Sequence, residues 1–169
     1  MKKISRVTMG MDKVSNTPII FLQVENTNTV VPIWIGPCEA GVIALLLRNE
    51  VFERPLTHDL IGNSIKELGA KPLEVLIDEF KKDIYYAKLV IEKNDSQIVY
   101  LDARPSDCII ISLKNNIPIF IDENIVNEHG IDISFIEDEN EEHIKKDIEN
   151  FDIDELRKRF EGKNKKGDD

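Results

Sequence analysis

The charged and polar residues that could do chemistry lie in three short segments, and each segment leads into a predicted helix. Their sequences are IGPCEA (35–40), RPLTHDL (54–60) and DARPSDC (102–108). Asp59, Asp102 and Asp107 supply carboxylate oxygens, which Mg²⁺ and Mn²⁺ prefer as ligands, and such a bound cation activates water. These three carboxylates are the candidate metal ligands of the chain.

Two arginines and one histidine complete a set suited to phosphodiester hydrolysis. Arg54 and Arg104 each stand directly before a proline at a predicted helix start. An arginine beside a helix N-terminus can bind a phosphate and neutralise the charge that develops on its oxygens. His58 or a carboxylate would carry the proton. The candidate catalytic residues are His58, Asp59, Asp102, Arg104 and Asp107.

Helix-start chemistry alone explains part of this pattern. Glu39 and Asp107 each follow a proline by two residues, and a carboxylate in the first turn of a helix meets free N–H groups and the positive end of the helix dipole. Thr57 is a good N-cap residue, worth about 1 kcal/mol. Arg54 and Arg104 could equally pair with neighbouring carboxylates. The same residues would therefore also suit an anion-binding module without catalytic activity.

Hydrophobic periodicity and turn signals predict an α+β fold, with antiparallel strand meanders and helices packed on them. A strand meander leads into a proline-initiated helix twice, which points to an internal duplication. The predicted strands are 4–14, 19–24, 30–35, 73–80, 84–92, 97–101 and 118–121. Pro32 places the third strand at an edge or at a bulge. The predicted helices start at Pro37, Thr57 and Pro105, with a helical turn at 123–128, and Gly69 closes the second of them.

Composition limits the classes of protein that fit. With 22 basic against 32 acidic residues the net charge is −10, which argues against non-specific nucleic-acid binding through a broadly basic surface. No apolar run is long enough to cross a bilayer. Two cysteines exclude zinc held by a cysteine cluster and favour a reduced, cytoplasmic setting.

The chain changes character toward its end. Residues 132–169 carry 14 acidic and 8 basic side chains with sparse apolar residues. This predicts two parts, a domain over residues 1–137 and an acidic helical extension over residues 138–169 with a disordered end.

Four runs of sequence resemble the bifunctional nuclease domain family in the identity, order and spacing of their residues. They are IGPCEAGVIALLL (35–47), RPLTHDLI (54–61), DARPSDCIIISL (102–113) and PIFIDENIV (118–126). The resemblance covers residues 4–130, and RPLTHDL and DARPSD are its most specific strings.

The resemblance implies a bacterial or plant nuclease that hydrolyses both DNA and RNA with low sequence specificity. It also implies an α+β domain with a mixed, largely antiparallel sheet that forms a homodimer. Nucleic acid is then the expected partner. The carboxylates allow Mg²⁺ or Mn²⁺ as a cofactor without requiring one, and the lack of a long apolar run predicts no membrane association. The alternative is a regulatory module that binds an anion or a protein. The motif positions are Glu39, Arg54, Thr57, His58, Asp59, Asp102, Arg104, Ser106 and Asp107, of which Arg54, Thr57, Ser106 and Glu39 are expected to bind substrate.

Overall fold

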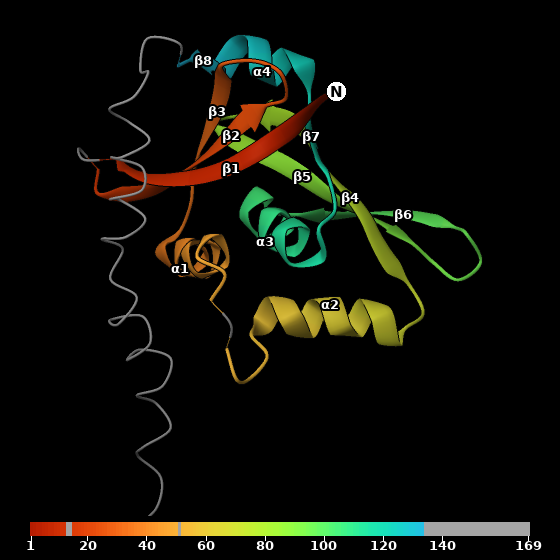
Figure 1. Cartoon of the computed structure of the whole chain (residues 1–169). Helices are drawn as coiled ribbons and strands as arrows, with labels where there is room; N and C mark the ends of the chain where they lie inside the picture. Colours follow the sequence, from red (N-terminus) through yellow and green to blue (C-terminus); the bar gives the residue numbers. More distant parts are fainter. Residues whose placement is uncertain (13–14, 51, 134–169) are drawn as a thin grey trace, which may run out of the picture.

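The computed structural model describes residues 1–12, 15–50 and 52–133, and it confirms the predicted α+β fold (Figure 1). The strands in this part of the chain are β1 (Lys2–Asp12), β2 (Thr17–Val24), β3 (Thr29–Trp34), β4 (Lys71–Lys81), β5 (Ile84–Glu92), β6 (Ile98–Ala103), β7 (Ile119–Ile121) and β8 (Ile131–Asp132). The helices are α1 (Pro37–Leu47), α2 (Thr57–Glu67), α3 (Pro105–Asn115) and α4 (Glu123–His129). None of these helices has the length and apolar character needed to cross a membrane.

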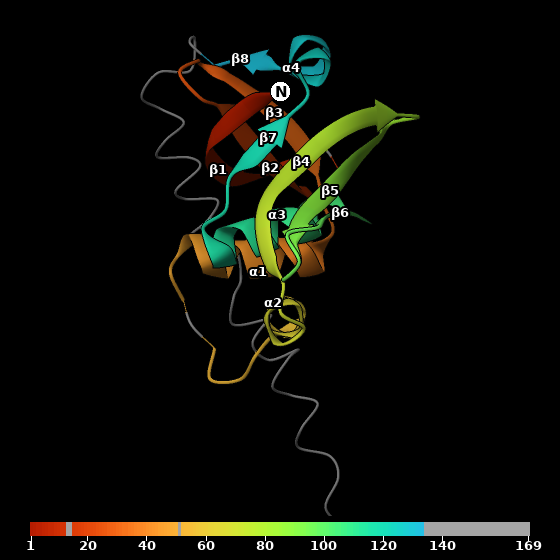
Figure 2. The same cartoon turned by 90° about the vertical axis from the view of Figure 1, so that its right-hand side faces the viewer.

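All eight strands belong to one sheet, in the order β6-β5-β4-β7-β1-β2-β3-β8. The two predicted meanders, β1-β2-β3 and β4-β5-β6, are both antiparallel. Short β7 joins them, because it pairs in parallel with β4 and antiparallel with the first residues of β1. Figure 2 shows the two meanders as separate curved layers that diverge on either side of β7.

Two details of the sheet concern its edges. At Pro32 strand β3 pairs with β2 only, because β8 reaches no further than Val30, so the predicted edge position is confirmed. Strand β8 was missed by the sequence prediction, since two residues are too short to give a periodic pattern. The predicted internal duplication stays a prediction.

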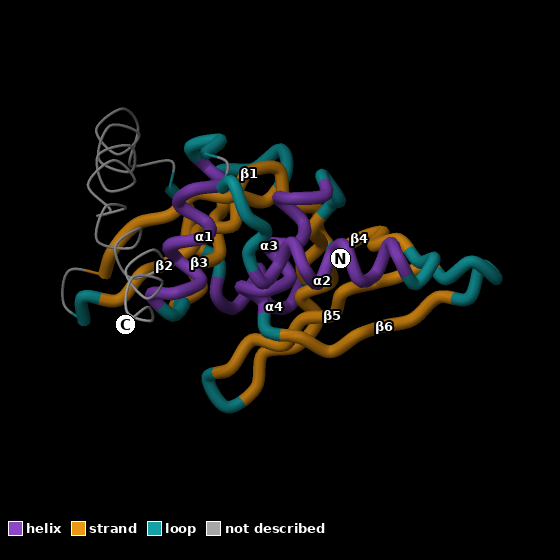
Figure 3. The backbone as a smooth tube through the Cα atoms, turned by 90° about the horizontal axis from the view of Figure 1, so that it is seen from below, coloured by secondary structure: helices purple, strands orange, loops and turns teal. Residues whose placement is uncertain are grey.

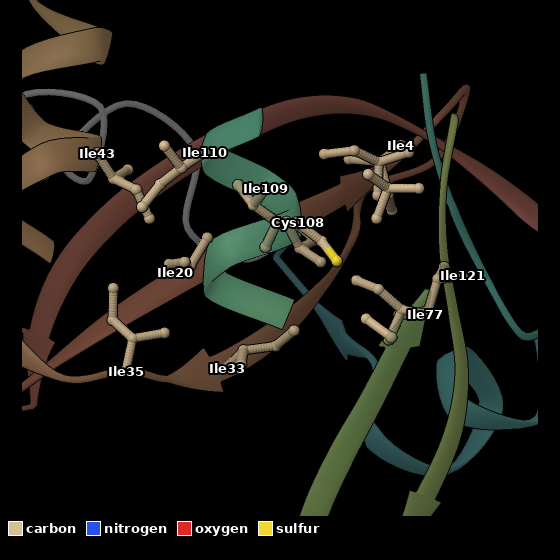
Figure 4. Packing of buried hydrophobic residues seen from close by; sticks show 14 of the residues in the cluster. Ile4, Ile20, Ile33, Ile35, Ile43, Ile77, Cys108, Ile109, Ile110 and Ile121 are labelled. Carbon is tan, nitrogen blue, oxygen red and sulfur yellow. The ribbon is translucent and has the colours of Figure 1, made fainter. Parts of the chain in front are cut away.

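Helices α1, α2 and α3 lie together on one side of the sheet (Figures 1 and 3). Helix α3 is the most deeply placed, because its buried side chains face the sheet on one side and α1 and α2 on the other. Figure 4 shows Cys108 and Ile109 of α3 among isoleucines from both halves of the sheet, including Ile20, Ile77 and Ile121. This packing fixes the start of α3 relative to the other helix starts.

The ends of the helices follow the predicted signals with one correction. Pro37 and Pro105 occupy first helical positions, where the missing N–H costs nothing. Gly69 follows α2 with a φ of 72°, the left-handed conformation that favours glycine. Thr57 is not the N-cap of α2, because Leu56 holds that position and Thr57 is the first helical residue. The predicted extension over residues 138–169 lies outside the described residues.

Candidate functional site

The first turns of α1, α2 and α3 meet at one place, and Asp107 stands at its centre. One Asp107 oxygen lies 3.0 Å from Nε2 of His58, and the other accepts a 2.8 Å hydrogen bond from Nε of Arg104. Nη2 of Arg104 lies 2.8 Å from a carboxylate oxygen of Glu39. We call Glu39, His58, Arg104 and Asp107 the helix-start cluster. Segments 54–59 and 102–107, which lie far apart in the sequence, therefore meet at His58 and Asp107.

Local sequence explains how α1 and α3 bring these side chains together. Pro37 and Pro105 start the two helices, so Glu39 and Asp107 both fall in a first turn and beside free backbone N–H groups. Gly36 leaves the room that Glu39 uses, because a Cβ on Gly36 would lie only 2.5 Å from a Glu39 carboxylate oxygen. Arg104 at the N-cap of α3 then reaches both acids.

The charges in the cluster determine the tautomer of His58. Partial burial raises the pKa of Asp107, but the hydrogen bonds and charges of Arg104 and His58 outweigh burial and leave this pKa below its usual value. An ionised carboxylate only accepts hydrogen bonds, so Nε2 of His58 carries the proton and donates. Nδ1 is then the nitrogen with the lone pair when the ring is neutral, and among the described residues it is buried without a hydrogen-bond partner.

Arg104 is the member of the cluster that solvent reaches. Its side chain is 66% exposed, whereas the side chains of His58, Glu39 and Asp107 are 10%, 15% and 23% exposed. Its hydrogen bonds to Asp107, together with the nearby Glu39, raise the pKa of the guanidinium, so it is always charged. Within the described part of the chain Nη1 makes no hydrogen bond, so an anion can approach this nitrogen from solvent.

Asp59 has a different set of partners, although it is adjacent to His58. One oxygen accepts a 2.7 Å hydrogen bond from Nζ of Lys114, and the other accepts a 2.8 Å bond from the backbone N–H of Leu56. Burial raises the pKa of Asp59, but these bonds outweigh it and lower the pKa overall. Asp59 therefore closes the first turn of α2 and fastens that helix to the last turn of α3.

Asp102 lies apart from the cluster. It is exposed on β6, where it stands opposite Lys88 of β5, and it makes no hydrogen bond to the described site residues. No three His, Cys, Asp or Glu side chains in the described part of the chain are grouped to hold a metal ion. Both oxygens of Asp59 and of Asp107 are already hydrogen-bonded, so the residues as placed do not form a ready metal site. A metal requirement stays a prediction.

The remaining predicted residues divide by exposure. Arg54 and Thr57 are exposed, whereas Ser106 is buried in α3. Arg54 makes no ion pair with any described residue and lines a pocket of about 780 Å³ between the ends of α1 and α3 and the start of α2.

Burial, with help from nearby carboxylates, raises the pKa of the Cys108 thiol to about 12, so this buried cysteine is not a nucleophile.

Sequence reasoning missed Lys114, which pairs with Asp59 and lines the same pocket. The only feature of the sequence that marks Lys114 is its position in the last turn of α3, where a lysine usually interacts favourably with the helix dipole. A contact between residues 55 positions apart leaves no local pattern.

The fold and the cluster define an α+β domain whose candidate site is built from three helix starts. The model of the bifunctional nuclease domain matches residues 20–134, and the chain belongs to this family. An uncharacterised protein of Mycobacterium tuberculosis is 34% identical over 142 residues, which cover 84% of this chain and 82% of that protein.

Two plant relatives carry the family's name. Bifunctional nuclease 1 of Oryza sativa subsp. indica is 25% identical over 130 residues, 76% of this chain and 39% of the rice protein. Bifunctional nuclease 1 of Arabidopsis thaliana is 26% identical over 117 residues, 68% of this chain and 36% of that protein. The chain thus matches well under half the length of these plant proteins.

Proposed function

We propose that this protein is a nuclease that hydrolyses DNA and RNA phosphodiesters with low sequence specificity, and that the helix-start cluster is its active site. The supporting observation is the exposed guanidinium of Arg104. It is ion-paired with Glu39 and Asp107 at the place where the N-termini of three helices meet. Helix N-termini and an arginine both favour phosphate, so the cluster can bind an anion despite the net charge of −10. Membership of the bifunctional nuclease domain family supports the same activity.

Each residue of the cluster has a role in this proposal. Arg104 binds the scissile phosphate and stabilises the charge of the transition state. His58 accepts the transferred proton at Nδ1, while Asp107 keeps the other ring proton on Nε2 and fixes the orientation of the ring. Nδ1 is covered in this conformation, so the first turn of α2 must shift before water reaches it. Glu39 is a positioning residue that acts through Arg104.

Activity on single-stranded RNA and DNA tests the proposal, with Mg²⁺, with Mn²⁺ and with EDTA in parallel. We expect Arg104→Ala and His58→Ala each to lower kcat/KM by about 100-fold or more, the usual cost of removing one group that stabilises or transfers charge in the transition state. The matched control is Lys71→Ala. Lys71 is 67% exposed and ion-paired to Glu92, much as Arg104 is exposed and paired, but it lies at the start of β4.

The outcomes separate the two candidate functions. Activity that falls in both cluster variants and persists in Lys71→Ala supports the nuclease. Activity unchanged in both cluster variants identifies a contaminating enzyme and favours the anion-binding or protein-binding module. This module remains the second candidate, because Arg104 and the helix N-termini would bind an anion whether or not hydrolysis follows.

The metal, the assembly and the cellular compartment belong to the same proposal. Loss of activity in EDTA that Mg²⁺ or Mn²⁺ restores would show the metal requirement, whichever residues bind the ion. We propose that the protein acts in the cytoplasm, where free cysteines such as Cys38 and Cys108 are usual. We also propose that it forms a homodimer, which the resemblance to the bifunctional nuclease domain family implies.

A further inference from the structure

A pocket lies between the end of α1, residues 52–56, the start of α2 and the end of α3 (Figure 1). Its volume of about 780 Å³ falls in the range of roughly 300–1,000 Å³ that is usual for small-molecule sites. Arg54 lines it, and we call it the Arg54 pocket. The four residues of the helix-start cluster are not among the described residues that line it. The Arg54 pocket is therefore a second candidate site.

The less exposed part of the wall of the Arg54 pocket is apolar. Its apolar side chains are buried or half-buried, and they are Val42, Leu45, Leu46, Phe52, Leu56 and Leu113. Phe52 supplies an aromatic ring beside the aliphatic side chains. The flat face of a nucleobase packs well on a surface of this composition. The pocket therefore suits a ligand that has a flat, largely apolar part.

Three asparagines line the more exposed part of the Arg54 pocket. Asn49 follows α1, Asn63 lies on α2 and Asn116 follows α3, and all three are exposed. Their side-chain amides make no hydrogen bond to any described residue. An amide group both donates and accepts hydrogen bonds, and this combination matches the edge of a nucleobase, above all that of adenine. The same ligand can therefore have a polar edge.

Two cations also line the Arg54 pocket. Nζ of Lys114 donates a 2.7 Å hydrogen bond to Asp59, and the lysine side chain is only 17% exposed. An ammonium has three N–H donors, and within the described part of the chain the other two have no acceptor. Arg54 is exposed and has no ion pair with a described residue. Both cations can therefore bind a phosphate that enters the pocket.

Carboxylates beside these cations narrow the class of ligand. Glu50 and Glu53 line the pocket, together with the Asp59 that is paired to Lys114. These carboxylates would repel a ligand that is only an anion, such as inorganic phosphate. A ligand that is only apolar would leave the charged groups without partners. A nucleotide has a phosphate for the cations, hydroxyl and amino groups that donate to carboxylates, and a flat base.

We propose that the Arg54 pocket binds one nucleotide, with the base against Phe52 and the asparagines and the phosphate on Arg54 and Lys114. The choice of a nucleotide over another amphipathic anion rests on the proposed function, which brings nucleic acid to these helices. Asp107 and Lys114 are seven residues apart on α3, so about 10 Å separates them along the helix axis. The pocket can therefore hold a nucleotide of a strand whose scissile phosphate lies at Arg104, or a free nucleotide.

Binding of adenosine 5′-monophosphate to the full chain tests the pocket, because this nucleotide has no phosphodiester bond to hydrolyse. Titration calorimetry should show one saturable site in the wild type. Arg54→Ala should raise the dissociation constant about 10-fold or more, the usual cost of a lost charge-assisted hydrogen bond. The same substitution should leave the affinity for adenosine unchanged, because adenosine lacks the phosphate.

A second substitution and a matched control complete the binding test. Asn63→Ala should weaken the binding of both ligands about 3-fold or more, because it removes a hydrogen bond to the base. The control is Lys66→Ala, since Lys66 is exposed on the same helix and has the same charge as Arg54 but does not line the pocket. Its substitution should leave both affinities unchanged. Circular dichroism of each variant shows whether the fold is retained.

Arg104→Ala separates the Arg54 pocket from the helix-start cluster, because it should abolish nuclease activity and leave the affinity for the mononucleotide unchanged. A wild type that does not bind the mononucleotide would overturn the pocket proposal. So would a loss of affinity in Arg104→Ala or Lys66→Ala that Arg54→Ala does not exceed. Both results leave the proposed function in place. Binding that depends on Arg54 in a chain without nuclease activity would overturn the proposed function alone.

Steady-state kinetics on single-stranded RNA identify the source of the nucleotide. If the pocket holds a nucleotide of the substrate strand, Arg54→Ala should raise KM with kcat nearly unchanged, because it removes binding that is equal in the ground state and the transition state. A KM that stays the same while the affinity for the mononucleotide falls would identify a free nucleotide as the ligand.

Discussion

At the scale of single residues, the three aspartates of the two motifs have different uses. Asp107 joins His58 to Arg104, Asp59 fastens α2 to Lys114, and Asp102 stands on a strand opposite Lys88. The difference arises from position, because Asp59 and Asp107 both fall in the first turn of a helix and each lies beside a cation, Lys114 for Asp59 and Arg104 for Asp107. A carboxylate in that position is stabilised in its charged form.

The lowered pKa of Asp107 predicts how stability depends on pH. The pKa of Asp107 in the folded protein lies below the usual aspartate value of 3.8. The carboxylate therefore stabilises the fold fully above about pH 4, and this stabilisation is lost as the pH falls through the lower folded pKa. Asp107→Asn should lower the free energy of unfolding near neutral pH by about 1–3 kcal/mol, since it removes hydrogen bonds to a charged group.

Urea unfolding at neutral pH and near pH 3 measures this effect. The gap in unfolding free energy between the wild type and Asp107→Asn should narrow at the acidic end, because the carboxyl of the unfolded wild-type chain takes up a proton there before the folded one does. A gap of equal size at both values would show that the charge of Asp107 does not stabilise the fold.

At the scale of elements, α2 is the least buried of the three helices around the cluster. Gly62 is its one buried residue, and the helix is held by Asp59 at its start and by a left-handed glycine after its end. Because α2 carries His58, its anchoring decides how firmly the histidine sits against Asp107. Substitutions at Gly62 and Gly69 change the stability of α2 without changing any residue of the helix-start cluster.

Gly69→Ala and Gly62→Ala should have opposite effects on stability. Gly69 has a φ of 72°, and a Cβ there would also lie 2.0 Å from the Asn94 side chain, so we expect a loss of about 1–2 kcal/mol. At Gly62 the nearest atom to a new Cβ is 3.9 Å away, and alanine in a helix interior should add about 0.5–1 kcal/mol. Thermal unfolding of both variants measures the pair, and destabilisation by Gly62→Ala would contradict this account.

At the scale of the whole molecule, two antiparallel meanders become one sheet through β7, and one hydrophobic core spans both halves. Ile121 of β7 is fully buried between them, and α3 packs on residues from each half. This arrangement predicts that the halves do not unfold separately.

Trp34 is the only tryptophan and lies on β3, so its fluorescence reports on one meander, while far-UV circular dichroism reports on the whole domain. We expect the two urea transitions to coincide, because a shared core makes unfolding cooperative. We also expect Ile121→Ala to shift both together, with a loss of about 2–5 kcal/mol. A Trp34 transition displaced from the other signal would indicate two independent units.

Much of the fold and part of the site follow from the sequence alone. Alternation, turn residues and prolines at first helical positions predict both meanders and the start of each helix, because these features depend on neighbours a few residues apart. The motif residues of the three segments were also identified from the sequence, and His58 and Asp107 do meet.

Only the tertiary structure decided which partners these residues have. Asp59 forms an ion pair with Lys114, Asp102 is exposed on β6, and Arg104 forms ion pairs with two carboxylates. These side-chain pairings depend on how α1, α2 and α3 cross over the sheet. The same is true of the pairing of β7 with both meanders. Contacts between residues 50 or more positions apart arise from packing, and packing of this kind produces no periodic pattern in the amino-acid sequence.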